Sequence, residues 1–173
     1  MKTAKKLQLR YPSLVVYIPS CRRVFDEKFR KGLEKYEIKG KVISQQDDSE
    51  LMLYIYSLAK LALCKSGTVN MELALYGIPQ IIGYKVSRVT AFIAKRILNF
   101  KVRFISPVNL LMKKLIIPEF VQKNFNEKKI FYKACRLLDL TSEKAKIKKG
   151  YILLKKELGD EGVVDRAAKE IIN

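Results

Sequence analysis

Histidine and tryptophan are absent from this chain of 173 residues. Without histidine, catalysis by imidazole and most zinc sites are excluded, so any proton transfer must use a carboxylate, lysine, tyrosine, cysteine or water. Cysteine occurs only as Cys21, Cys64 and Cys135, which are odd in number and too far apart for a CxxC-type metal site. A disulfide framework is therefore not expected, and the sequence predicts neither a metal nor a cofactor.

Long hydrophobic runs are missing as well. The longest nearly uninterrupted apolar run, residues 51–59, contains Ser57 and is too short to cross a bilayer. The opening stretch MKTAKKLQLRYP has positive charges but no apolar core, so it is not a secretory leader. Because 49% of the residues are hydrophobic and 30% are charged, we expect a folded chain whose length suits one domain, residues 1–173.

Positive charge, by contrast, is abundant: 35 lysines and arginines outnumber 17 acidic residues, for a net charge of +18. Such a chain attracts nucleic acid, anionic lipid head groups or phosphorylated substrates. Usage rich in lysine and isoleucine is also typical of an AT-biased genome, which is a second explanation. Nucleic acid is the less favoured partner, because the sequence has no RNP-like aromatic motif, zinc-finger spacing or clear helix-turn-helix pattern.

Short β-type runs alternate with helical patterns in the first half of the chain. Alternation of this kind builds βαβ units, so we predict an α/β fold, a Rossmann-like parallel sheet flanked by helices. The loop FISPVNLL is compatible with a short fifth strand, and residues 126–173 are predicted to form a helical C-terminal tail. Strands are expected at 14–18, 42–44, 61–64 and 80–84, and helices at 1–12, 22–36, 51–58 and from the turn at 66–68 to residue 76.

The turn Ser66-Gly67-Thr68 follows a predicted strand and precedes a predicted helix. Open α/β sheets bind ligands beyond the carboxyl ends of their strands, and backbone N–H groups at a helix start favour phosphate or carboxylate. Glu72, one turn further on, is placed to accept hydrogen bonds from hydroxyls such as those of a ribose. The competing interpretation is a plain helix cap with an exposed Glu72.

Two further segments have a functional and an ordinary interpretation. Ser106-Pro107-Val108-Asn109, with Glu119 beyond it, forms either the rim of the same crevice or a simple loop. Residues 87–100, SRVTAFIAKRILNF, are predicted to form a basic amphipathic helix that either lies on an anionic membrane or packs one face on the sheet. Its membrane-surface candidates are Arg88, Phe92, Lys95 and Arg96.

Taken in order, SGTVNMELALYGIPQIIGYKVSRVTAFIAKRIL, ISPVNLL and IPEFVQ resemble the C-terminal half of the lipid-A-disaccharide synthase family. The resemblance implies the C-terminal, donor-binding domain of a GT-B glycosyltransferase. That family transfers 2,3-diacylglucosamine from its UDP-sugar to lipid X in lipid A biosynthesis. On matching positions, Ser66, Gly67 and Thr68 would face the diphosphate and Glu72 the ribose. Asn109 and Glu119 match loop positions near the donor cleft.

The resemblance also implies what lies outside this chain. We expect the family's N-terminal acceptor domain with its catalytic base to be absent, so catalytic residues stay unassigned. The domain's first strand and its Gly-Ser-Arg loop are expected to be absent too. The implied partners are a UDP-sugar, an anionic membrane surface, and a separate acceptor domain or further copies of the chain. The implied location is cytoplasmic and peripheral to the inner membrane, or else plastid; the alternative function is a non-catalytic basic module that binds membrane or nucleic acid.

Overall fold

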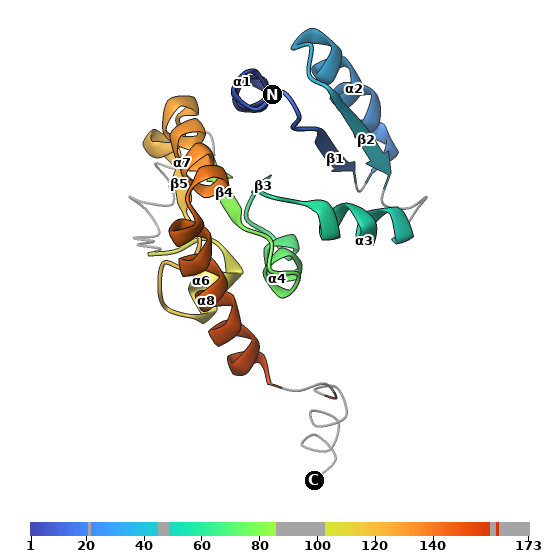
Figure 1. Ribbon diagram of the computed structural model, residues 1–173. Helices are drawn as coiled ribbons and strands as arrows, with labels where there is room; N and C mark the ends of the chain where they lie inside the picture. Colours follow the sequence, from blue (N-terminus) through green and yellow to red (C-terminus); the bar gives the residue numbers. More distant parts are fainter. Residues whose placement is uncertain (21, 45–48, 86–102, 160–161, 163–173) are drawn as a thin grey trace, which may run out of the picture.

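The computed structural model describes residues 1–20, 22–44, 49–85, 103–159 and 162 (Figure 1). Strands alternate with helices up to the fourth strand, and helices alone follow the last strand, which confirms the predicted α/β fold. In chain order the elements are α1 (Lys2–Arg10), β1 (Val16–Ser20), the short 3-10 helix η1 (Arg23–Phe25), α2 (Asp26–Lys35), β2 (Gly40–Ser44), α3 (Ser49–Leu58), β3 (Ala62–Cys64), α4 (Val69–Leu75), β4 (Gln80–Tyr84), α6 (Pro107–Leu111), β5 (Glu119–Val121), the 3-10 helix η2 (Gln122–Asn124), α7 (Glu127–Asp139) and α8 (Thr141–Leu158).

The described strands pair in parallel but form two separate sheets. One sheet contains β1 and β2, with Val16 opposite Gly40. The other has the order β3–β4–β5, and its register aligns Cys64, Ile82 and Glu119 across the three strands. Parallel pairing brings the carboxyl ends of β3, β4 and β5 to one edge, which is where the predicted turn lies.

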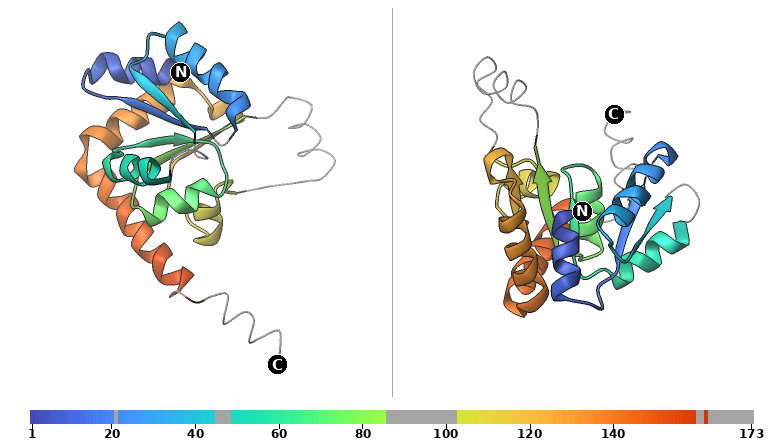
Figure 2. Two further views of the ribbon diagram at one scale, coloured as in Figure 1. Left: turned by 90° about the vertical axis from the view of Figure 1, so that its right-hand side faces the viewer. Right: turned by 90° about the horizontal axis from the view of Figure 1, so that it is seen from above.

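Strand β4 lies at the centre of the largest hydrophobic core. Ile81 and Ile82 are consecutive, so their side chains point to opposite faces of the sheet, and both are fully buried. A strand buried on both faces has helices on both sides, which explains its continuous apolar run. Seen from above, α1 lies between α7 and the β1–β2 unit (Figure 2). The helical residues of this core include Leu7, Ala74, Val108, Ala134, Leu137, Ile147, Tyr151 and Leu154.

The four strands predicted in the first half all form, and β4 has the predicted bounds. Strand β2 begins two residues earlier than predicted and β3 one residue later. Strand β1 starts at Val16 and extends to Ser20, because the Leu14 N–H group bonds the Tyr11 carbonyl in a turn after α1. A fifth strand in FISPVNLL is wrong, because this segment forms α6 instead. Ser106 caps α6 by accepting a hydrogen bond from the Asn109 N–H group, and Pro107 fits its first turn. The last strand is β5, further along the chain.

The predicted helical tail, residues 126–173, forms α7 and α8 over nearly all of its described part. Ile147, Tyr151 and Leu154 form the buried stripe of α8, which ends at Gly159, a residue with φ of 72°. The predicted helix at 87–100 and residues 163–173 of the predicted tail lie outside the described residues. Among the helices that the structure describes, none is long and apolar enough to cross a membrane.

Candidate functional site

The turn between β3 and α4 is shaped by a buried asparagine. Asn70 is fully buried, donates through Nδ2 to the Lys65 carbonyl at 3.1 Å, and accepts from the Gly67 N–H group at 2.9 Å. Thr68 makes no side-chain capping bond to α4, so the plain capped helix start is not what the structure shows. Sequence reasoning missed Asn70, although an asparagine placed to bond the backbone of a preceding turn is a recognisable pattern.

The face of the turn at Gly67 is open. A Cβ atom built on Gly67 meets no neighbouring atom within 4 Å, and its φ is outside the left-handed region. Neither the backbone conformation nor the packing therefore requires glycine here. Thr68 beside it is exposed. The open face leaves room for a ligand to approach the backbone closely.

Ser66 joins this turn to the loop before α6. Its hydroxyl donates to the Ile105 carbonyl at 2.5 Å, and the side chain is half-buried. The two segments are far apart in sequence, and this contact places the second predicted cluster directly beside the turn. The structure therefore brings Ser66 and the rim segment together.

Glu119 organises the rim segment from β5. Its Oε2 atom accepts the Ile105 N–H group at 2.9 Å. Its Oε1 atom accepts the Ser106 N–H group at 2.9 Å, the Ser106 hydroxyl at 2.7 Å and Asn109 Nδ2 at 2.7 Å. A carboxylate that accepts several strong donors holds those donors in place. The Glu119 carboxylate thus fixes the backbone that Ser66 contacts.

Asn109 is fully buried and uses both ends of its amide. Nδ2 donates to the Ile117 carbonyl at 2.8 Å as well as to Glu119, and Oδ1 accepts from the N–H groups of Ile116 at 2.8 Å and Ile117 at 3.0 Å. Both Asn109 and Glu119 are therefore engaged within the chain and shape the rim. That either residue contacts a nucleotide-sugar directly stays a prediction.

Glu72 is half-buried on α4 rather than exposed. Burial, followed by the charge of Glu72 and a hydrogen bond to it, raises the pKa of Tyr56 to about 12. The phenol is protonated at neutral pH and donates a hydrogen bond to the Glu72 carboxylate. The Tyr76 ring lies 5.2 Å from that of Tyr56, between centroids. Sequence reasoning missed Tyr56, because only the fold brings α3 next to α4.

Lys65 places a cation beside the turn. Lys65 is exposed, and its Nζ atom lies 5.5 Å from the centroid of the Tyr84 ring at the end of β4. A lysine held at this place supplies positive charge next to the open face. The neighbouring Cys64 does not supply a nucleophile, because burial raises the pKa of its thiol to about 12.

A buried hydrogen-bond network connects α4 to β4 and α8. Gln80 donates through Nε2 to the Asn70 carbonyl at 2.9 Å and to the Tyr151 hydroxyl at 3.1 Å. That hydroxyl donates to the Ile78 carbonyl at 3.0 Å. The turn is therefore anchored to α8 through side chains distant in sequence, which gives it the rigidity that a binding site needs.

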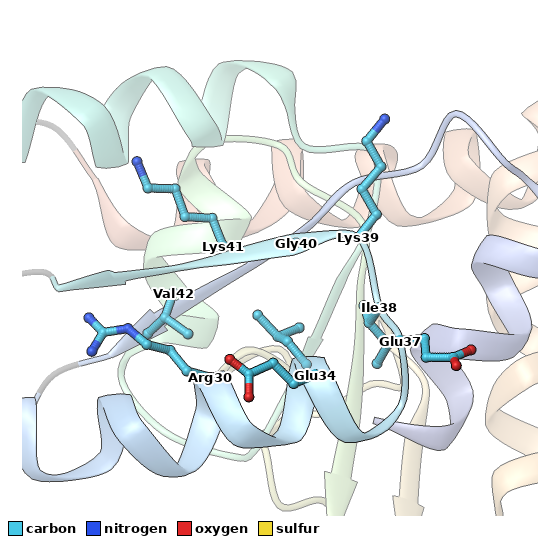
Figure 3. Close-up of a pocket in the computed structure, with 9 residues that line it drawn as sticks. Arg30, Glu34, Glu37, Ile38, Lys39, Gly40, Lys41 and Val42 are labelled. Atoms are coloured by element: carbon cyan, nitrogen blue, oxygen red, sulfur yellow. The ribbon is translucent and has the colours of Figure 1, made fainter.

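A hollow of the described surface lies elsewhere, on the α2–β2 unit (Figure 3). It has a volume of about 530 Å³, and none of the predicted site residues lines it. Its charged lining mixes cations and carboxylates, so it has no single electrostatic preference. We therefore place the candidate site at the carboxyl ends of the strands, where open α/β sheets bind ligands, and not in this hollow. The lining residues are Arg30, Leu33, Glu34, Glu37, Ile38, Lys39, Gly40, Lys41 and Val42.

The predicted membrane-surface residues Arg88, Phe92, Lys95 and Arg96 lie outside the described residues. The structure therefore does not show whether they form one face of a helix, and their role stays a prediction.

Known proteins resemble this chain over nearly its whole length. The family model for lipid-A-disaccharide synthetase matches residues 1–171. The lipid-A-disaccharide synthase of Prochlorococcus marinus (strain MIT 9313) is 45% identical over 172 residues, which is 99% of this chain and 44% of that protein. The enzyme of the same name from Gloeothece citriformis (strain PCC 7424) is 33% identical over 172 residues, again 99% of this chain and 44% of the relative.

The chain thus spans less than half the length of these curated relatives. The match nevertheless includes the turn after β3, the rim segment and both C-terminal helices. Because the family model covers almost every residue, this chain belongs to the lipid-A-disaccharide synthetase family of glycosyltransferases.

Proposed function

We propose that this chain is the donor-binding part of a lipid-A-disaccharide synthase-like glycosyltransferase and binds a UDP-sugar at the turn after β3. The observation that carries the proposal is the open face at Gly67 between Lys65 and the half-buried Glu72. A diphosphate needs close approach to backbone N–H groups and a nearby cation, and a ribose needs an acceptor for its hydroxyls. All of these lie within residues 65–72.

Each site residue has a role in this proposal. The diphosphate contacts the backbone of residues 66–68 and the Thr68 hydroxyl, while Lys65 balances part of its charge. Glu72 accepts hydrogen bonds from the ribose, and Tyr56 orients the carboxylate. Glu119 and Asn109 hold the rim segment in place beside Ser66.

The reaction follows the family's chemistry. A hydroxyl of the acceptor, lipid X, attacks the anomeric carbon of 2,3-diacylglucosamine, and the bond from that carbon to the UDP oxygen breaks. The hydroxyl proton passes to a base, and UDP leaves with the bonding electrons. We assign the base to the acceptor-binding part of the enzyme and not to this chain. The proposed location is the cytoplasmic surface of an inner membrane, where both lipid substrates are available; a plastid membrane is the alternative.

Calorimetric titration of the chain with UDP tests the proposal. Replacement of Glu72 by Gln keeps the size of the side chain but removes its charge, so affinity should fall by about five- to 150-fold, the equivalent of about 1–3 kcal/mol. Glu34→Gln, at an exposed carboxylate in the hollow near β2, is the matched control and should leave the affinity unchanged. A folded chain that binds no UDP, or equal losses in both variants, would rule out this site.

The high positive charge favours a second candidate, a basic module that binds anionic membranes or nucleic acid without catalysis. Flotation with vesicles of phosphatidylglycerol tests the membrane version. Binding that persists without nucleotide and disappears when Arg88, Lys95 and Arg96 are replaced by Gln supports a membrane anchor. Binding to RNA with a steep dependence on salt supports the nucleic-acid version instead.

A further inference from the structure

The outer edge of β2 borders the hollow on the α2–β2 unit. Among the described strands β2 pairs only with β1, so no described strand covers its other edge. The Val16 N–H group bonds the Lys39 carbonyl at 3.0 Å, which directs the backbone groups of Lys39 and Lys41 towards β1. The backbone groups of Gly40 and Val42 therefore point outward, and both residues line the hollow. Such an edge is a template for pairing with another strand.

The hollow has an apolar floor beside this edge. Leu33, Ile38 and Val42 line it, and the same three side chains form one hydrophobic cluster of the β1–β2 unit. Gly40 has no side chain, so the strand backbone itself is reached from the hollow at that position. An extended segment laid along β2 can therefore pair its backbone with the edge and place apolar side chains on this floor.

The border of the hollow on the α2 side carries balanced charges. Arg30 and Glu34 are one helical turn apart on α2, so their opposite charges are neighbours on the helix surface and offset each other. At the end of the hollow, the Glu37 carboxylate lies 3.3 Å from Lys5 Nζ, and the same lysine donates to the Glu37 carbonyl at 2.9 Å. This side therefore favours neither an acidic nor a basic partner.

The border on the β2 side is positive. Lys39 and Lys41 are two residues apart, so their side chains lie on one face of the chain there, and both extend away from α2 (Figure 3). Both are exposed, and neither forms an ion pair within the described part of the chain. Lysines on an edge repel the same edge of a second copy, so a strand that pairs here must carry acidic side chains on this face.

We propose that the outer edge of β2 binds an extended segment of another protein in which acidic and apolar residues alternate. Its backbone pairs with Gly40 and Val42 and adds a strand to the β1–β2 sheet. Successive side chains of a strand point to opposite faces, so its apolar residues contact Leu33 while its acidic residues lie beside Lys39 and Lys41. None of the predicted site residues lines the hollow, so binding of this segment is separate from binding of a nucleotide.

Amide hydrogen exchange with residue resolution, measured on the whole chain, tests this proposal. The probe is a capped peptide of alternating glutamate and valine, about seven residues long, which is an ordinary strand length. At saturation the amides of Gly40 and Val42 should exchange at least about tenfold more slowly, whereas the Lys41 amide, which faces β1, should change little. A peptide of alternating lysine and valine has the opposite charge and should bind at least about tenfold more weakly.

Paired substitutions separate this edge from the general attraction of an acidic peptide to a chain with a net charge of +18. Lys39→Glu with Lys41→Glu should weaken binding of the glutamate–valine peptide at least about tenfold, because repulsion replaces attraction. Lys28→Glu with Lys35→Glu makes the same change at exposed positions of α2 outside the hollow and should weaken it less than about twofold. The proposal is overturned if the glutamate–valine peptide does not bind the folded chain, if the lysine–valine peptide binds as tightly, if the outward amides of β2 stay unprotected, or if both lysine pairs weaken binding equally.

Discussion

Asn109 donates to Glu119 at 2.7 Å, from Nδ2 to Oε1, and this contact joins α6 to β5. Each partner also binds backbone on either side of α6: Glu119 holds Ile105 and Ser106, and Asn109 holds Ile116 and Ile117. The pair closes the loop around α6 into a compact unit. Ser66 then connects this unit to the proposed donor site.

Glu119→Ala should lower the free energy of unfolding by at least about 2 kcal/mol, since hydrogen bonds to a charged acceptor contribute about 1.5–3 kcal/mol each. The substitution leaves the N–H groups of Ile105 and Ser106 without this acceptor. Urea denaturation measures the change. Glu34→Ala, at an exposed carboxylate, should stay within about 0.5 kcal/mol. Equal values for the two variants would contradict the organising role of Glu119.

Replacement by alanine should destabilise the fold at Gly40 but not at Gly67. A Cβ atom at Gly40 would lie 2.3 Å from the Val16 carbonyl oxygen, whereas one at Gly67 meets nothing within 4 Å. Gly40→Ala should therefore destabilise the fold by about 2 kcal/mol or more, because backbone must move to relieve the overlap. Gly67→Ala should be nearly neutral in the same thermal or urea unfolding experiment. A strongly destabilised Gly67→Ala variant would show that this glycine is structural.

Tyr151→Phe should cost about 1–2 kcal/mol of unfolding free energy. The change removes a buried hydroxyl that accepts from Gln80 and donates to the Ile78 carbonyl, leaving both without this partner. Tyr132→Phe removes an exposed hydroxyl and is the matched control. If the Tyr151 variant were as stable as the control, the buried network would not anchor α4.

Stability should fall at alkaline pH in a way that depends on Tyr56. Burial and Glu72 raise the pKa of Tyr56 from 10.0 to about 12, so the unfolded chain loses this proton first. The stability that Tyr56 provides is therefore complete below pH 10 and declines as the pH rises towards 12. Unfolding measured at a series of pH values should show a shallower decline for Tyr56→Phe. Tyr54→Phe, at an exposed position on the same helix, should follow the unmodified chain.

Gln8→Ala should destabilise the contact between α1 and the β1–β2 unit by about 1 kcal/mol. The side-chain amide bonds both the N–H group and the carbonyl of Lys39, and also the Leu14 carbonyl at 2.9 Å. Leu9→Ala, on the exposed side of the same helix, is the control. Amide exchange in β1 and β2 should accelerate in the Gln8 variant only. Unchanged exchange there would mean that α1 does not fasten this unit.

The alternation of β-type and helical runs was sufficient to predict the α/β fold, because hydrophobic periodicity is a local property of the chain. The same local pattern placed Ser66–Thr68 at the end of a strand and predicted β4 with its observed bounds. The motif order also indicated the family. The local pattern missed β5 and also α6, where a Ser106 cap and Pro107 outweigh the β-type residues before them.

Only the tertiary structure decided which side chains meet. Tyr56 and Glu72 belong to different helices, and the partners of Ser66 and Glu119 lie far along the chain, so no spacing rule reveals these contacts. The division of the described strands into two sheets likewise depends on strand pairing in space. The sequence by itself determined the order and type of most elements, because these follow from local periodicity and turn chemistry. Long-range packing and hydrogen bonding decided the architecture of the site.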